Sequence, residues 1–240
     1  MELLNELWKR AKRDKKRIVL PEANDPRVLK ATDILLHSKL VDVTLVGNPD
    51  KVNALARQHQ CDISRAQIED PQAAGKLASF AEFIYMKRKN KGLTLEAAKK
   101  IILEHPLFYG GMLLQKGEAH GMVGGSLHPT ADTIRAALWT VGMAPDSKLL
   151  SSFTIMLLHK KEFGENGTLF YADCGVVPAP AAEELAQIAI DTAASFRRLM
   201  NQEPKIALLS FSTQGSAKHP SVDRVIEATR IVREKKPDLF

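Results

Sequence analysis

The sequence predicts an α/β protein built on a parallel sheet. Two short buried runs rich in β-branched and aliphatic residues, at 17–21 and 41–46, alternate with helical patterns of apolar residues. The turns Asn24-Asp25-Pro26 and Gly47-Asn48-Pro49 follow these runs, and proline in the first turn is typical of a helix start. Strands and helices that alternate in this order favour parallel strand pairing, because each helix returns the chain across the sheet.

Composition places the chain among globular proteins and argues against nucleic-acid binding. The 240 residues are 45% hydrophobic and 26% charged, and the formal net charge is +6. The basic residues gather at 9–17, 87–91 and 230–236, without the interleaved aromatic residues that base stacking needs. We interpret these clusters as solvated helix faces and expect no nucleic-acid partner.

Several classes of site and location are disfavoured by what the chain lacks. Cys61 and Cys174 cannot form a disulfide framework, which favours a reducing compartment. No apolar run resembles a signal peptide or a membrane span, so we expect a cytoplasmic protein without a membrane partner. The histidines lack metal-ligand spacing, and neither a G-x-G-x-x-G nor a Walker A motif occurs. We therefore expect no metal and no bound cofactor.

The remainder of the first region continues the α/β pattern. After an amphipathic helix at the N-terminus, we expect further helices at 74–91 and 95–105, with Thr94 as the N-cap of the latter and Gly92 ending the former. Residues 63–69 are a candidate third strand. Residues 108–114, with two adjacent glycines, and residues 117–123 lead into the next motif.

The segment GMVGGSLHPTADTIRAALWTV, residues 121–141, carries the strongest chemical signal from residue pattern alone. A strand end precedes Gly124 and Gly125, where backbone N–H groups can approach a ligand closely. Ser126 and Thr130 add hydroxyl groups, and Thr130 is a suitable N-cap for the helix that follows. Arg135 lies one turn inside that helix, so the pattern predicts an anion site.

Two further features of this segment are expectations of the same kind. Ile134, Leu138 and Val141 have the spacing of a helix face that packs on the core. His128 is a candidate acid or base, although a loop histidine before proline is more often structural. An ordinary loop between strand and helix, with an exposed arginine, explains the same spacing equally well.

The character of the chain changes near residue 147, so we predict one domain over 1–147 and a second over 148–240. In the second, strands are expected at 149–158, 168–172 and 205–210, and helices at 181–199 and 222–235. The last strand runs into the Ser/Thr-rich loop FSTQGSAKHP. This loop and segment 121–141 have the same feature: both place hydroxyl groups and free backbone N–H groups at the carboxyl end of a strand.

Five blocks, taken together and in this order, resemble the phosphate acetyltransferases. More loosely they are similar to phosphate butyryltransferases and to the C-terminal domain of some malic enzymes. The blocks are LPEANDPRVLKA, YMKRKNKG, PLFYGGMLLQKGEAHGMVGGSLHPTADTIRAAL, FYADCGVVPAPAAEELAQIA and IALLSFSTQGSAKHPSVDRVIEATRI.

The resemblance implies two three-layer α/β/α domains with the active site in a cleft between them, in a homodimer. It implies reversible acetyl transfer between coenzyme A and inorganic phosphate, with acetyl-CoA and phosphate as small-molecule substrates and no separate cofactor. Arg88 and Arg135 match the family's two phosphate-handling arginines. Ser212, Thr213 and Ser216 match a loop that lines the acyl phosphate, and Ser126 and Thr130 are further candidates for substrate binding.

The chain also departs from the family pattern. Val177 and Ala179 replace expected asparagines, which leaves the acyl group less determined than the phosphate. Family members continue into a segment with a serine-arginine pair and an aspartate that deprotonates the CoA thiol, and these do not map here. We therefore expect an incomplete second domain and no turnover by these 240 residues alone. Two alternatives stay open: a non-catalytic domain that senses acyl-CoA or phosphate, and a butyryltransferase-like enzyme.

Overall fold

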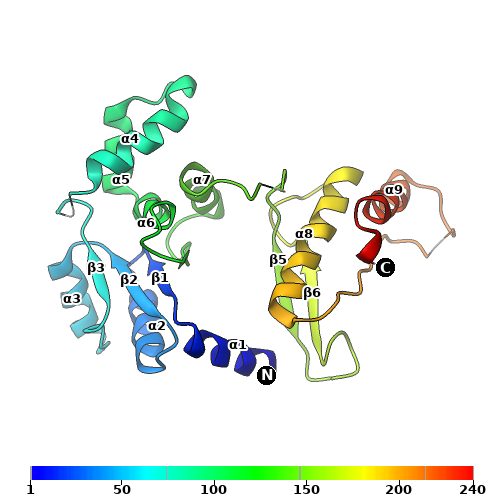
Figure 1. The fold of residues 1–240 in the computed structure, drawn as a ribbon, viewed down its shortest axis with the longest axis horizontal. Coiled ribbons are helices and arrows are strands. Elements are labelled where there is room, and N and C mark those ends of the chain that lie inside the picture. Colours follow the sequence, from blue (N-terminus) through cyan, green and yellow to red (C-terminus); the bar gives the residue numbers. More distant parts are fainter. Residues whose placement is uncertain (1, 74, 146, 214, 240) are drawn as a thin grey trace. The chain divides into compact units, whose positions relative to one another are not determined.

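The computed structural model describes residues 2–73, 75–145, 147–213 and 215–239 (Figure 1). Ala74, the first residue of the helix predicted at 74–91, and Gln214, in the loop FSTQGSAKHP, lie outside the described residues. Contacts divide the chain into a first unit, Trp8–Gly142, and a second unit, Met143–Phe240 together with Met1–Leu7. This division lies between Gly142 and Met143, whereas the predicted domain boundary lies at residue 147, and the beginning of the chain groups with the second unit.

The first unit contains a four-stranded parallel sheet. Its order is β3-β2-β1-β4, and each neighbouring pair is parallel. The strands are β1 (Arg17–Leu20), β2 (Asp42–Val46), β3 (Gln67–Glu69) and β4 (Gly121–Met122). The predicted parallel sheet and its third strand are thus confirmed.

Helices cover both faces of this sheet, which makes the first unit three-layered. Val19 and Val46 belong to one core cluster, whereas their neighbours Leu20 and Leu45 belong to another. Adjacent strand residues point to opposite faces, so each strand contributes to both cores. Its helices are α2 (Pro26–His37), α3 (Pro49–Gln58), α4 (Leu77–Arg88), α5 (Leu95–Glu104), α6 (Pro106–Gln115) and α7 (Thr130–Thr140), with a short 3₁₀ helix, η1 (Lys89–Lys91). The N-terminal helix α1 (Glu2–Arg13) is divided between the two units.

Side-chain caps explain several helix starts in the first unit. The side chains of Asp25, Asn48 and Thr94 accept hydrogen bonds from the backbone N–H groups of the first turns of α2, α3 and α5. Gly92 ends η1 with φ of 85°, a left-handed conformation that favours glycine. The predicted Thr94 cap and Gly92 terminus are confirmed.

The packing face of α7 differs from the predicted one. Its buried residues are Ala136 and Thr140, whereas Val141 is 49% exposed. A Cβ built on Gly111 of α6 would lie 3.0 Å from the Cβ of Thr140. Because α6 and α7 approach so closely there, small side chains form the interface, and the larger aliphatic residues of α7 do not define the core face.

The second unit contains an antiparallel hairpin and two long helices. The strands β5 (Phe153–Leu157) and β6 (Thr168–Ala172) pair along their whole length, from Phe153 with Ala172 to Leu157 with Thr168. The helices α8 (Ala182–Met200) and α9 (Pro220–Lys235) share a core built mainly from alanine, isoleucine and valine, and the short η2 (Pro237–Leu239) follows.

The strand predicted at 205–210 does not form in the described structure. The segment makes no strand pairing, although its burial alternates as in a strand: Ile206 and Leu208 are partly buried against the helix core, whereas Leu209 is 77% exposed. The prediction of a strand here is therefore wrong, although the burial of the side chains alternates. What the segment lacks is a neighbouring strand edge within hydrogen-bonding distance.

Candidate functional site

The loop between β4 and α7 is folded around the carboxylate of Glu22. The backbone N–H groups of Gly125 and Ser126 donate to one carboxylate oxygen at 2.6 and 2.7 Å, and the Ser126 hydroxyl donates to the same oxygen at 3.0 Å. The N–H groups of Leu127 and His128 donate to the other oxygen at 2.8 and 3.1 Å. Four consecutive backbone N–H groups thus bind one internal anion.

Strand order explains how residues 103 positions apart meet. Glu22 lies two residues after the end of β1, β4 is the parallel neighbour of β1, and the carboxyl ends of parallel strands meet at one edge of the sheet. The Glu22 side chain is 1% exposed. Desolvation by itself raises the pKa of Glu22, but the hydrogen bonds from His128 and the loop N–H groups outweigh it and lower the pKa to about 2.

The ring of His128 completes this arrangement. Its Nδ1 lies 2.6 Å from the second Glu22 oxygen. An ionised carboxylate only accepts hydrogen bonds, so Nδ1 carries the hydrogen and Nε2 is the ring atom left for other partners. This contact supports the interpretation of His128 as a structural residue.

A second hydrogen bond joins the segment after β1 to the loop between β4 and α7. Arg27 donates from Nη2 to the carbonyl oxygen of Ser126 at 2.7 Å, and its guanidinium also pairs with Asp25 at 2.7 Å. The Asp25 side chain is 3% exposed. Hydrogen bonds from Arg27, which are stronger than the opposing desolvation, lower the pKa of Asp25 to about 2. The loop is therefore held through both its N–H groups and a carbonyl group.

These contacts correct two predictions about segment 121–141. The segment does bind an anion, but in this structure the anion is Glu22, and the backbone donors predicted for a ligand already have this partner. Thr130 is the first residue of α7, and Pro129 occupies the N-cap position without a side-chain cap. A phosphate at Ser126 would compete with the hydrogen bond from its hydroxyl to Glu22.

Glycine is needed at two loop positions for different reasons. A Cβ on Gly124 would lie 2.6 Å from Cδ2 of Leu107, so that backbone packs directly on α6. Gly125 has φ of 102°, and a Cβ there would lie 3.2 Å from the hydroxyl of Thr133. Both glycines therefore allow the loop to pack closely on α6 and α7, within hydrogen-bonding distance of Glu22.

Arg135 projects from the first half of α7 into solvent. Its side chain is 53% exposed, and Nη1 donates to Asp132 at 2.8 Å, one turn earlier on the helix. The guanidinium has five N–H donors, so this bond leaves donors for a ligand. Arg135 is thus a partly engaged cation on a helix that begins at the Glu22-bound loop.

Arg88 lies against the same helix. Its guanidinium carbon is 4.7 Å from the ring centroid of Trp139, which is one turn after Arg135 on α7. The neighbouring Lys87 donates to the carbonyl oxygen of Thr140 at 3.0 Å. The end of α4, with Arg88, is therefore bound to α7, the helix that carries Arg135.

The predicted serine and threonine residues of the FSTQGS loop belong to the second unit. Ser212 and Thr213 contact the hydroxyl of Ser216 at 2.8 and 2.9 Å. These hydroxyls form a small cluster bonded mainly to itself and to the backbone. Their assignment to substrate binding stays a prediction.

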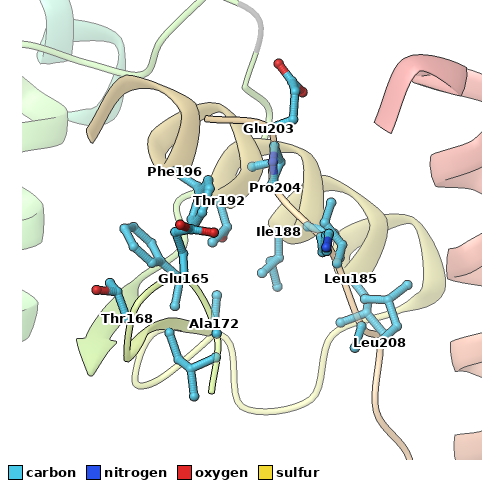
Figure 2. Close-up of a pocket in the computed structure, with 18 residues that line it drawn as sticks. Glu165, Thr168, Ala172, Leu185, Ile188, Thr192, Phe196, Glu203, Pro204 and Leu208 are labelled. Atoms are coloured by element: carbon cyan, nitrogen blue, oxygen red, sulfur yellow. The ribbon is translucent and has the colours of Figure 1, made fainter. Parts of the chain in front are cut away.

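The second unit also contains a cavity of about 390 Å³ (Figure 2). Leu185, Ile188 and Thr192 of α8 line it, together with β6 and residues 203–208. Most of the residues that line it are apolar, polar groups contribute about half of the lining surface, and none of the predicted site residues is among them. We therefore place the candidate chemistry at the first unit's loop and α7.

Two negative findings concern the described residues alone. They contain no cluster of three or more His, Cys, Asp or Glu side chains that could hold a metal ion. Among the described helices, none combines the length and hydropathy needed to span a bilayer.

Comparison with known proteins supplies the family. The family described as Phosphate acetyl/butaryl transferase matches residues 2–240. The chain belongs to this family. It is 45% identical over 239 residues to a phosphate acetyltransferase of Thermoanaerobacterium thermosaccharolyticum, covering 100% of this chain and 72% of that protein. A phosphate acetyltransferase of Acetivibrio thermocellus is 44% identical, with 100% and 71% covered.

Solved structures of family members agree with the fold. A phosphotransacetylase from Streptococcus pyogenes superposes with a TM-score of 0.89 at 34% identity, covering 99% of this chain and 70% of that one. The EutD phosphotransacetylase from Staphylococcus aureus has a TM-score of 0.86 at 32% identity, with 99% and 69% covered. The resemblance found in the sequence is therefore confirmed.

Glu22 is the residue of this site that sequence reasoning missed. It belongs to the block LPEANDPR, which helped identify the family but was given no chemical role. The available signal was a glutamate placed directly after a buried strand, at the edge where the neighbouring parallel strand also ends. In this family member, two of the five blocks meet through that one carboxylate.

Proposed function

We propose that the protein transfers an acetyl group reversibly between coenzyme A and inorganic phosphate. The observation that carries this proposal is the family match over residues 2–240, together with relatives of known name that share 44–45% of its residues. The geometry supports the phosphate half of the reaction, because Arg135 is an exposed cation on a helix whose first turn follows a tightly held loop.

The chemistry requires charge stabilisation at the phosphate. The thiolate of coenzyme A attacks the carbonyl carbon of acetyl phosphate, a new C–S bond forms, and the bond from that carbon to the bridging phosphate oxygen breaks. Negative charge then builds on the departing phosphate. A guanidinium group can bind phosphate oxygens in a bidentate manner and stabilise this charge.

We assign this task to Arg135, with Arg88 as a second contributor. Arg88 stacks on Trp139 and is half-buried, so its guanidinium is held in one orientation. Arg135 has one side-chain partner, Asp132, and stays half exposed. This proposal therefore gives Arg135 the larger part of phosphate binding and Arg88 a supporting one.

The main test compares three arginine variants of the protein in an assay of acetyl-CoA formation. Arg135→Ala should lower kcat/KM by about 10²–10³-fold, the size of effect seen when a charge-stabilising donor is removed. Arg88→Ala should lower it by roughly tenfold or more. Arg65→Ala, an exposed arginine before β3, is the matched control. Equal activity of the Arg135 and Arg65 variants would overturn the role of Arg135.

A second measurement separates catalysis from sensing. The CoA thiol must lose its proton before it attacks, and no residue has been assigned to that step. Acetyl phosphate binding, followed by phosphorus NMR, and formation of acetyl-CoA should be measured on the same protein. Binding without turnover would favour the non-catalytic sensing domain over the enzyme.

The acyl group, the assembly and the location complete the proposal. We propose acetyl as the acyl group, a homodimer as the assembly and the cytoplasm as the location. Val177 and Ala179 favour the butyryl alternative, so the ratio of kcat/KM for acetyl and butyryl phosphate decides between them. Sedimentation equilibrium tests the dimer, and fractionation of cells tests the location.

A further inference from the structure

The backbone N–H groups of the loop between β4 and α7 have an internal partner. Residues 125–128 direct four consecutive N–H groups and one hydroxyl at the two oxygens of Glu22, with distances of 2.6–3.1 Å. The Glu22 side chain is almost fully buried, and both of its oxygens accept several hydrogen bonds. A substrate phosphate cannot take these donors unless Glu22 leaves them.

The position of α7 depends on the same contacts. The helix begins at Thr130, two residues after His128, whose N–H and ring are both bonded to Glu22. Arg135 lies in the second turn of this short helix. Displacement of the loop would therefore move the start of α7 and the guanidinium of Arg135 with it.

We propose that Glu22 is a positioning residue of the phosphate site. It fills the anion-binding loop from within, so substrate phosphate is bound by the side chains of α4 and α7 and not by the loop N–H groups. This inference rests on the proposed function, because it names the way in which the same phosphate site is built. Glu22 itself contacts no substrate in this scheme.

Two substitutions of Glu22 test the arrangement. Glu22→Gln keeps the shape but replaces one acceptor oxygen by an NH₂ group, which faces N–H donors and loses their hydrogen bonds. Glu22→Asp keeps the charge on a shorter side chain and should restore part of the effect. The matched control is Glu69→Gln, at a carboxylate that is also largely buried and accepts from Lys76 at 3.0 Å and Tyr109 at 3.1 Å, away from the loop.

The first readout is hydrogen exchange of the loop amides, which requires no activity. In Glu22→Gln, the amides of Gly125, Ser126, Leu127 and His128 should exchange at least tenfold faster than in the wild type. In Glu69→Gln, their exchange should change less than threefold, and Glu22→Asp should fall between. Unchanged protection in Glu22→Gln, or the same loss in Glu69→Gln, would overturn the loop-holding role.

The second readout is an NMR titration of the wild type with acetyl phosphate. The side-chain Nε of Arg135 should shift more than the amides of Gly125–His128, because the latter stay bonded to Glu22. Larger shifts at the loop amides would overturn the inference, since they would show phosphate on those donors.

The third readout is acetyl phosphate affinity. The dissociation constant should rise about tenfold in Glu22→Gln, recover partly in Glu22→Asp and stay within twofold in Glu69→Gln. Equal affinity of wild type and Glu22→Gln would overturn the positioning role even if the loop amides exchange faster. Absence of acetyl phosphate binding by the wild type would refute the proposed function instead. The exchange data would still show whether Glu22 holds the loop at residues 125–128.

Discussion

Each unit uses a carboxylate just after a strand to gather the N–H groups of a nearby loop. Glu22 follows β1 and binds residues 125–128. Asp173 follows β6 and accepts from the N–H groups of Ser152, Gly175 and Val176 at 2.7–2.9 Å. Desolvation opposes ionisation of Asp173, but these hydrogen bonds prevail and hold its pKa well below the usual range. Both carboxylates are therefore charged internal ligands.

The low pKa of Glu22 predicts loss of stability in acid. Its pKa is about 2 in the folded protein against an ordinary value of 4.5, so the unfolded chain binds more protons between these values. The contribution is complete above about pH 4.5 and is lost as the pH falls towards 2, by roughly 3 kcal/mol in total.

Urea unfolding between about pH 5 and about pH 3 measures this effect. The free energy of unfolding should fall less steeply with acid in Glu22→Gln than in the wild type. Glu82→Gln, at an exposed glutamate of α4, serves as the control and should keep the wild-type slope. Identical slopes in all three proteins would contradict the prediction.

Substitution of Asp132 should strengthen acetyl phosphate binding, whereas substitution of Glu22 should weaken it. The carboxylate of Asp132 accepts a hydrogen bond from Nη1 of Arg135 at 2.8 Å. It therefore places a negative charge beside the proposed phosphate site. Asp132→Asn should tighten acetyl phosphate binding by about two- to fivefold, because an exposed ion pair is worth only about 1 kcal/mol or less. Isothermal titration at low and high salt measures it. Weaker binding in the variant would show that Asp132 orients Arg135.

At the scale of elements, α6 and α7 are joined by a contact that has no room for extra atoms. A Cβ on Gly111 would overlap the side chain of Thr140. Gly111→Ala should lower the free energy of unfolding by about 1–3 kcal/mol, despite the better helix propensity of alanine. Chemical denaturation of the variant measures this loss.

A double-mutant cycle separates this clash from a general effect on α6. Thr140→Ala removes the hydroxyl and methyl groups that the new Cβ would meet. The double variant should therefore be more stable than the sum of the single effects predicts, by at least about 0.5 kcal/mol. Strictly additive effects would mean that the contact between these two positions does not limit the packing.

Helix boundaries were the most predictable elements. Two helix starts were predicted from Pro26 and Pro49, and a third from Thr94 as N-cap. The side chains of Asp25, Asn48 and Thr94 accept backbone hydrogen bonds at these starts, whereas the predicted cap at Thr130 was wrong. The face of α7 was less predictable, because Ala136 and Thr140 are buried by the close approach of another helix. Spacing on one helix cannot reveal how near its neighbour lies.

At the scale of the whole molecule, the two units differ in how well their strands are paired. The sheet of the first unit has four paired strands, whereas residues 205–209 of the second unit have strand-like burial without strand pairing. Their amides should exchange about 10²-fold faster than those of Leu169–Tyr171 in β6. Hydrogen exchange with mass spectrometry compares the two segments in one sample. Equal protection would show that residues 205–209 have a strand partner in solution.

The sequence by itself determined the α/β class, the main helix starts and the family, because these depend on local periodicity, capping residues and the order of short motifs. Arg88 and Arg135 were likewise named from motifs, and their roles stay predictions. Only the tertiary structure decided what the glycine-rich loop binds. β1 and β4 are neighbours in the sheet although far apart in the chain, and this places Glu22 against residues 125–128. A loop with free backbone N–H groups predicts an anion site, but the order of the strands in the sheet decides that the anion bound there is the carboxylate of Glu22.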